Sequence, residues 1–237
     1  MEKVKIRLIY EKLLQKLKEA NDKPSQHQDS YGGNKDKKLH LRIATIRKIA
    51  QDLVAANKNL TTSEWVELFG FLSNGEFDEE KQLIGKILEN HSDLRKSISS
   101  KEVEKILAKM EGWSQVDSVC QSVFGAKELL LHWEEWKKTI KTLTKSPNLN
   151  KRRAGLVLLT APVRQSTDEG FANLGLEVID KAKGEKDKLI TKAISWLLRE
   201  MIKNHRAKVE EYLENNKDSL PAIAVRETEN KLRTGKK

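Results

Sequence analysis

The chain has 237 residues, 38% hydrophobic and 34% charged, with a formal net charge of +10. This composition excludes a disordered chain, and 12 Gly and 4 Pro are too few for a turn-rich all-β fold. The single Cys120 excludes an intrachain disulfide, and no signal peptide or apolar run of the ~18 residues of a membrane span is found, so we expect a cytoplasmic protein without membrane contact.

Helical periodicity predicts about a dozen helices and no strand. Residues 2–20 read as an amphipathic helix, and the polar residues 22–38, with Pro24 and Gly32-Gly33, predict a flexible loop. Further helices are predicted around residues 39–53, from 61 to about 73, up to about 89, and over 99–112, 113–125, 126–144, 149–162, 166–183 and 187–204, followed by two short helices.

Three capping boxes mark helix starts, at Thr61-x-x-Glu64, Ser99-x-x-Glu102 and Ser166-x-x-Glu169. The helices form short antiparallel pairs of roughly 35–45 residues, the period of helical solenoids. We therefore predict an all-α, HEAT-repeat-like α-α superhelix as a single domain over residues 1–237, with a disordered tail at 234–237. A compact irregular helical bundle is the alternative.

The charge is unevenly distributed along the chain. Residues 1–60 carry 14 Lys/Arg and 7 Asp/Glu, residues 61–150 carry 12 and 15, and residues 151–237 carry 19 and 13. Two basic ends around a mildly acidic middle indicate a polyanionic partner, whereas the alternative is a lysine-rich surface that only confers solubility.

The sequence lacks the common catalytic motifs. It has no P-loop, no dinucleotide-binding glycine motif and no serine nucleophile elbow, and its five histidines are scattered without cysteine partners. We therefore predict no cofactor and no metal site.

Two stretches stand out as candidate functional segments. In a helix, Trp113 and Asp117 project about 40° apart on one face, where an indole and a carboxylate can hold a cation. Trp196 lies in the basic helical pattern Lys192-x-x-x-Trp196-x-x-Arg199. The alternatives are that Ser114 caps a helix with Asp117 at its dipole, and that Trp196 fills the core.

Three segments resemble the DNA alkylation repair family of HEAT-like DNA glycosylases, the AlkD type. They are Trp113-Ser114-Gln115-Val116-Asp117-Ser118, Arg152-Arg153-Ala154-Gly155-Leu156 and Lys192-Ala193-Ile194-Ser195-Trp196-Leu197-Leu198-Arg199-Glu200. Arg226-Glu227 is similar to the family's closing helix, and Tyr31 matches its N-terminal tyrosine loosely.

The resemblance implies a superhelix whose concave face holds duplex DNA, and removal of cationic N-alkylated purines such as 3-methyladenine and 7-methylguanine without flipping the base into a pocket. Asp117 would be the catalytic carboxylate, with Trp113 and Trp196 at the deoxyribose and backbone of the lesion. The other DNA-binding residues would be Arg153 at the phosphate, with Arg152, Lys192, Arg199 and Tyr31.

We therefore expect a monomeric enzyme of base excision repair: a monofunctional DNA glycosylase acting on double-stranded DNA that contains alkylated bases. The alternative is a non-catalytic HEAT-like module that binds DNA or protein. Abundant lysines leave a lyase step through a Schiff base open.

Overall fold

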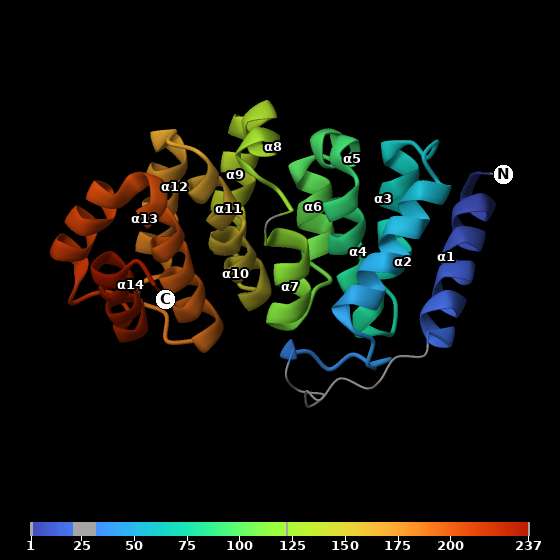
Figure 1. Ribbon diagram of the computed structural model, residues 1–237, viewed down its shortest axis with the longest axis horizontal. Coiled ribbons are helices and arrows are strands. Elements are labelled where there is room, and N and C mark those ends of the chain that lie inside the picture. The colour runs from blue at the N-terminus through green and yellow to red at the C-terminus, as the bar shows by residue number, and fades with distance from the viewer. Residues whose placement is uncertain (1, 21–31, 122, 237) are drawn as a thin grey trace. The chain divides into compact units, whose positions relative to one another are not determined.

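The computed structural model describes residues 2–20, 32–121 and 123–236. Within these ranges it contains 14 helices and no strand, apart from an isolated bridge between Lys37 and Phe77 (Figure 1). The all-α fold class is thereby confirmed. None of the described helices is long and apolar enough to cross a membrane.

The chain divides into two compact units, residues 1–119 and 120–237. The sequence predicts a single domain over this length, and that assignment stays a prediction. The helices of the first unit are α1 (Glu2–Glu19), α2 (Ile43–Ala56), α3 (Thr62–Ser73), α4 (Asp78–Asn90), α5 (Ser92–Ser97), α6 (Ser100–Leu107) and α7 (Gly112–Cys120).

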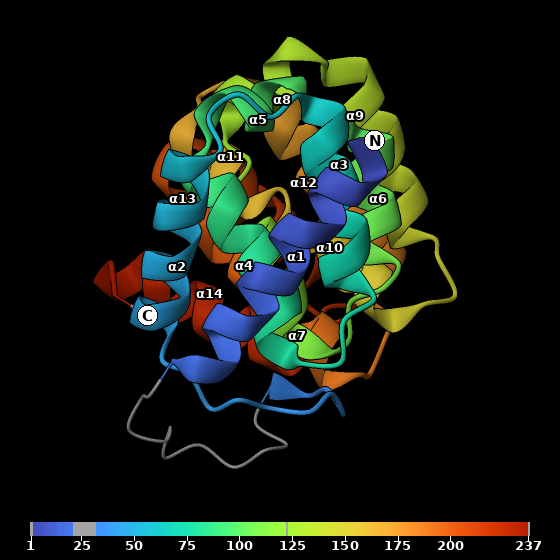
Figure 2. The same ribbon diagram turned by 90° about the vertical axis from the view of Figure 1, so that its right-hand side faces the viewer.

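The helices of the first unit form two rows. Helix α1 packs on α3 and α3 on α6, while α2 packs on α4 (Figure 2). Helix α7 continues the second row, because a Cβ on Gly85 of α4 would lie 1.9 Å from the Ser118 carbonyl oxygen of α7. Only glycine allows these two backbones to approach so closely.

The predicted start signals of two helices in this unit are confirmed. Thr61 and Ser99 each form a complete capping box with the glutamate three residues later. Large apolar side chains such as Trp65 and Phe69 are then buried between the rows, each contributing about 1.5–3 kcal/mol.

The helices of the second unit are α8 (Ala126–Leu131), α9 (Trp133–Thr144), α10 (Leu149–Val157), α11 (Thr160–Gln165), α12 (Glu169–Ala182), α13 (Lys188–Asn216) and α14 (Ala222–Thr234). Helix α9 packs on α10 and α12, and α13 packs on α10, α11, α12 and α14. The long helix α13 therefore contacts most of the unit.

Helix α13 bends at His205, whose backbone is non-helical (φ −133°, ψ 37°). There Asn204 donates to the carbonyl oxygens of Val163 and Arg164 at the end of α11 (3.2 and 2.8 Å), and His205 Nε2 lies 3.0 Å from the Ser166 oxygen. The bend therefore satisfies carbonyl groups that the end of α11 would leave unpaired.

The loop predicted over residues 22–38 and the tail predicted over 234–237 both contain residues that the structure shows to be ordered by contacts or by a helix. Residues 32–38 of the predicted flexible loop include Asn34, which is buried, and Lys37, whose backbone pairs with Glu76 and Asp78. At the other end, α14 includes Thr234, the first residue of the tail predicted to be disordered, and Gly235 ends the helix with φ +70°.

Candidate functional site

The candidate segment of the first unit, Trp113 to Asp117, begins where Gly112 meets the backbone of Gly32-Gly33. Gly112 has φ +67°, and a Cβ on it would lie 2.3 Å from the Gly32 oxygen and 2.4 Å from the Gly33 carbonyl carbon. Gly33 also has a positive φ of +72°, and a Cβ on it would lie 3.5 Å from Trp113 Cδ1. The backbone of Gly32-Gly33 therefore packs directly against the first turn of α7, beside the indole.

Trp113 and Asp117 lie one turn apart on α7, as the sequence predicts, and both are half-buried. Between them, Gln115 and Val116 are fully buried. The helix thus presents an indole and a carboxylate together on its partly solvent-exposed side, while its opposite side faces the interior of the unit.

The interpretation of Ser114 as the N-cap of this helix is wrong. Helix α7 begins two residues earlier, at Gly112. Instead, Ser114 Oγ donates to the Gly32 oxygen (3.3 Å) and accepts from Asn34 Nδ2 (3.2 Å). The hydroxyl that the local pattern assigned to the helix start is thus used in tertiary contacts with Asn34 and Gly32, which lie 80 and 82 positions earlier.

Sequence reasoning missed the polar interior behind this segment. Gln115 is completely buried and hydrogen-bonds to Asp36 and Asp78, and Asn34 also reaches Asp78 (2.9 Å). Gln115 itself stands in the quoted motif. The motif alone does not reveal these hydrogen bonds, because Asp36 and Asp78 are distant from Gln115 in sequence.

In the second unit, Trp196 is half-buried on α13 and its indole N–H is engaged. Nε1 donates to Glu200 Oε1 (3.1 Å), and Glu200 Oε2 accepts from Arg164 Nη1 of α11 (3.1 Å). Arg164 and Glu200 form an ion pair that holds the carboxylate in place. Hydrogen bonds through Glu200 to Arg164 therefore orient Trp196. The alternative interpretation was that this side chain only fills the core, but it is not fully enclosed there.

Arg153 is buried on α10, with 6% of its surface exposed, and its Nη1 donates to the Leu189 oxygen at 2.6 Å. It thereby connects α10 to the first turn of α13. Leu189 and Trp196 are seven residues apart, so they lie about 10 Å apart along one face of that helix.

Arg152 is committed to the protein rather than to the solvent. Its guanidinium forms two parallel bonds with Glu185 (2.8 and 2.9 Å), and Nη1 donates to the oxygens of Ser146 and Pro147 (both 2.9 Å). These contacts join the loop before α10 to the loop before α13 and balance the charge of Arg152.

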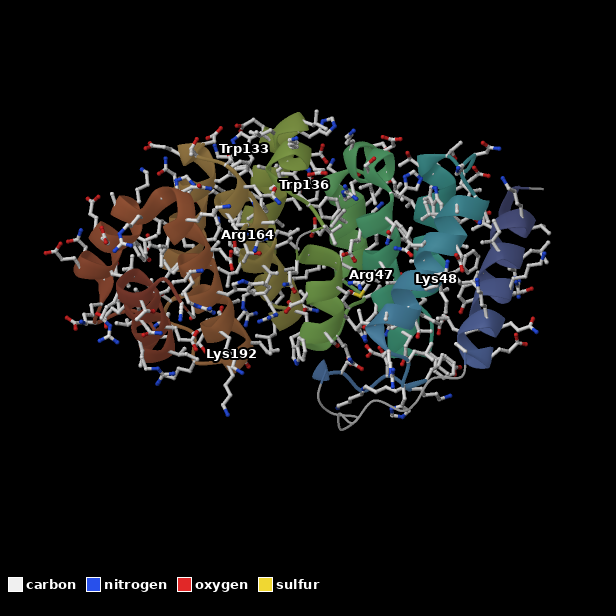
Figure 3. The ribbon with its side chains drawn as sticks, viewed as in Figure 1. Arg47, Lys48, Trp133, Trp136, Arg164 and Lys192 are labelled. Carbon is white, nitrogen blue, oxygen red and sulfur yellow. The ribbon has the colours of Figure 1, made fainter. Side chains whose placement is uncertain are left out.

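The two basic residues that flank Trp196 lie in different environments. Lys192 is exposed and its side chain extends away from α13 (Figure 3). Arg199 is buried, donates from Nε to the Ser195 oxygen (3.1 Å) and pairs through Nη2 with Glu227 of α14 (3.3 Å). The basic pattern of α13 thus combines one solvent-facing cation with one that stabilises the helix packing.

Tyr31 lies outside the described residues. Its sequence neighbour Gly32 is buried against Ser114 of α7, where a Cβ would come within 2.5 Å of Oγ. Among the described residues, no group of three or more His, Cys, Asp or Glu side chains could hold a metal ion.

The structure brings Trp113 and Asp117 together in the first unit, and connects Arg153 to the helix of Trp196 in the second. That the two groups act on one ligand stays a prediction.

Residues 13–232 match the sequence profile of the DNA alkylation repair enzymes. Among solved structures, the chain is similar to a predicted DNA alkylation repair enzyme from Enterococcus faecalis, with a TM-score of 0.71 and 18% identity, covering 86% of this chain and 92% of that one. At this identity the likeness supports the fold alone. No curated protein matches the chain.

Proposed function

Because the chain belongs to the DNA alkylation repair enzyme family, we propose that it is a DNA glycosylase that removes positively charged N-alkylated purines from duplex DNA. The bases we propose are 3-methyladenine and 7-methylguanine. The observation that carries the proposal is the pairing of Trp113 and Asp117 on the partly exposed side of α7.

The chemistry needs few protein groups, since an alkylated purine is already cationic and leaves readily. Breaking the glycosidic bond develops positive charge on the sugar, as in glycoside hydrolysis. The Asp117 carboxylate can stabilise this charge and orient water toward C1′. The indole face of Trp113 adds a cation–π attraction of about 1–2 kcal/mol in a desolvated site.

The second unit supplies the remaining contacts of the proposed site. Trp196 contacts the deoxyribose and backbone of the lesion, and Arg153 uses guanidinium donors for the phosphate, since arginine has five N–H groups. Lys192 adds an exposed cation. This proposal requires that both units contact the same duplex, with the enzyme acting as a monomer and without a cofactor.

The test is release of free 7-methylguanine or 3-methyladenine from methylated duplex DNA, measured by mass spectrometry. In Asp117→Asn we expect the single-turnover rate to fall at least about 100-fold, because one preorganised electrostatic group is lost. DNA affinity should change less than about 3-fold, since the side chain keeps its shape.

The matched control is Asp93→Asn, which removes one carboxylate from the same unit at a position whose side chain is 87% exposed. It should leave the release rate unchanged. Absence of release of either base by the wild type would refute the proposal, and equal loss in both variants would remove Asp117 from the chemistry.

A second candidate function, a non-catalytic DNA- or protein-binding module, is favoured by one observation. Arg152, Arg153 and Arg199 all make contacts within the protein, as expected of residues that stabilise helix packing. This candidate predicts equal affinity for methylated and unmethylated duplexes and no base release, which the same assay measures.

A further inference from the structure

Gln115 is the fully buried polar side chain at the centre of the Trp113–Asp117 turn, and its amide is completely used. Nε2 donates to Asp36 Oδ2 and to Asp78 Oδ1, both at 2.7 Å. Its Oε1 accepts from the backbone N–H of Glu111 at 2.8 Å, just before α7. The side chain therefore satisfies two carboxylates and one backbone group that has no partner within the helix.

The two carboxylates around Gln115 are themselves fixed. Asp36 forms an ion pair with Lys81, whose side chain is only 8% exposed. Asp78 accepts from Asn34 Nδ2 (2.9 Å) and from Gln82 Nε2 (2.7 Å). Because both partners of Nε2 are carboxylate oxygens, the position requires a side chain that donates twice, and burial makes any unsatisfied group there costly.

These contacts join three parts of the first unit. Asp36 belongs to the segment of residues 32–41, while Asp78 and Lys81 form the first turn of α4. The same segment is fixed further along by Glu79, which accepts from the backbone N–H groups of Leu39 and Leu41 (3.0 and 3.2 Å). Helix α7 engages this assembly through Gln115, which reaches Asp36 and Asp78, and through Ser114, which bonds to Gly32 and Asn34.

The geometry of the helix gives Gln115 control over the candidate site. Trp113 and Asp117 lie two residues before and after it, so they project about 160° from its direction, on the opposite side of the same turn. Fixing one side of a helical turn fixes the rotation and height of the other.

We propose that Gln115 is a positioning residue: by holding the first turn of α7 to Asp36 and Asp78, it aims Trp113 and Asp117 at the sugar of the damaged nucleotide. This inference rests on the proposed function. Gln115 contacts neither DNA nor water in the reaction, so its removal affects the rate through the placement of α7.

The first test compares Gln115→Leu with the matched control Gln82→Leu. Both remove an amide that donates to Asp78, but the Gln82 bond lies within α4, whereas the Gln115 bond joins α4 to α7. We expect Gln115→Leu to lower the single-turnover rate of base release about 100-fold, since displacements near 1 Å have this effect, with duplex affinity within about 3-fold. Gln82→Leu should keep the rate within about 2-fold. Equal rate losses in the two variants would overturn the proposal.

The second test uses Gln115→Glu, which retains the shape of the side chain. The introduced carboxyl faces Asp36 and Asp78, which carry like charge, and Lys81 offsets only part of that charge. The introduced glutamate is therefore expected to hold its proton to a higher pH than an ordinary glutamate. In the protonated form it donates one hydrogen bond. The ratio of variant to wild-type rate should rise as the pH falls, and a ratio that is independent of pH would contradict the assignment.

Hydrogen exchange separates this proposal from the proposed function. In Gln115→Leu, amides of residues 112–117 should exchange at least about 10-fold faster than in Gln82→Leu. If the wild type releases no base, the glycosylase proposal fails, and the exchange result alone decides whether Gln115 positions α7. Unchanged exchange at residues 112–117 would refute that role.

Discussion

Trp113 and Trp196 are both half-buried helical tryptophans, yet different contacts hold them. Trp113 packs against the Gly33 backbone at the start of α7, whereas the Trp196 N–H bonds to Glu200. A carboxylate that accepts from an indole N–H also increases the electron density of the ring, which favours attraction of a cation over its face. Glu200 is therefore expected to influence what Trp196 can bind.

Replacing Glu200 by alanine tests this dependence. The variant removes the acceptor of the indole N–H, and we expect a roughly 10-fold lower rate of base release, corresponding to about 1.4 kcal/mol. The control is Glu210→Ala on the same helix, which removes an exposed pair with Arg206 at 2.8 Å. That exposed pair contributes about 0.3–0.5 kcal/mol, so the control should keep its rate. A rate unaffected in Glu200→Ala would show that the indole needs no such support.

The sequence predicted the shared face of Trp113 and Asp117 because helical spacing is a local property. It could not identify Gln115 as their support, since its partners Asp36 and Asp78 lie 79 and 37 residues away. The arginines show the same limit: Arg199 and Lys192 both fit a basic pattern, but only packing decides that Arg199 faces Glu227 and Lys192 faces solvent.

Helix starts were predicted correctly at two of the three capping boxes. The boxes at Thr61 and Ser99 formed as predicted, but the one at Ser166 was wrong, because Asp168 caps α12 by accepting from the Gly170 N–H at 2.8 Å. Similarly, the predicted end of a helix at residue 204 coincides with the bend at His205. The continuation of α13 beyond the bend depends on tertiary contacts, which a local pattern does not contain.

The histidine that caps α5, His91, should make the stability of the protein depend on pH. His91 Nδ1 accepts from the Leu94 N–H at 3.3 Å, and the imidazole meets Trp65 edge to face. Burial lowers the pKa of His91, with Arg95 acting in the same direction and Asp93 opposing it. An ordinary histidine has a pKa of about 6.5, so below that pH the unfolded chain binds the His91 proton more readily than the folded protein does. The stability that neutral His91 contributes is therefore complete above about pH 6.5 and is lost as the pH falls through the lower pKa of the folded state.

The measurement is the free energy of unfolding by urea between about pH 5 and 8, a range that brackets the ordinary histidine pKa. The His91→Asn variant keeps an acceptor for the cap but does not titrate, so its stability should fall less than that of the wild type below about pH 6.5. His132→Asn, at an exposed histidine, should reproduce the wild-type curve. Parallel curves for all three proteins would exclude His91 as the titrating group.

For the whole molecule, the all-α class and the family were accessible from composition, helical periodicity and three short segments. Few glycines and prolines leave little but helices for a chain of this length, and family motifs survive because they are local in sequence. The division into two compact units was not accessible, since it depends on which helices pack together and not on where linkers occur.

The net charge of +10 predicts DNA binding that weakens with salt. Lys192 is exposed whereas Arg152 is paired with Glu185, so we expect them to contribute differently to that binding. Lys192→Ala should reduce the slope of log affinity against log salt by about 0.9, the value for one phosphate contact. Arg152→Met should leave that slope unchanged, because Glu185 already balances this charge. The measurement is fluorescence anisotropy with an undamaged duplex between about 50 and 200 mM salt. A reduced slope in Arg152→Met alone would reverse this assignment.

The close approach of Gly32-Gly33 to Gly112 has a consequence for chain connectivity. Residues 32–41 are anchored to α4 and α7 by their own bonds, and α1 is attached separately, through Lys5 to Glu64 and Tyr10 to Glu80 (2.7 and 2.8 Å). The contacts that hold α1 are therefore separate from those that hold residues 32–41 against α4 and α7. Loss of the α1 contacts should leave the first turn of α7 in place.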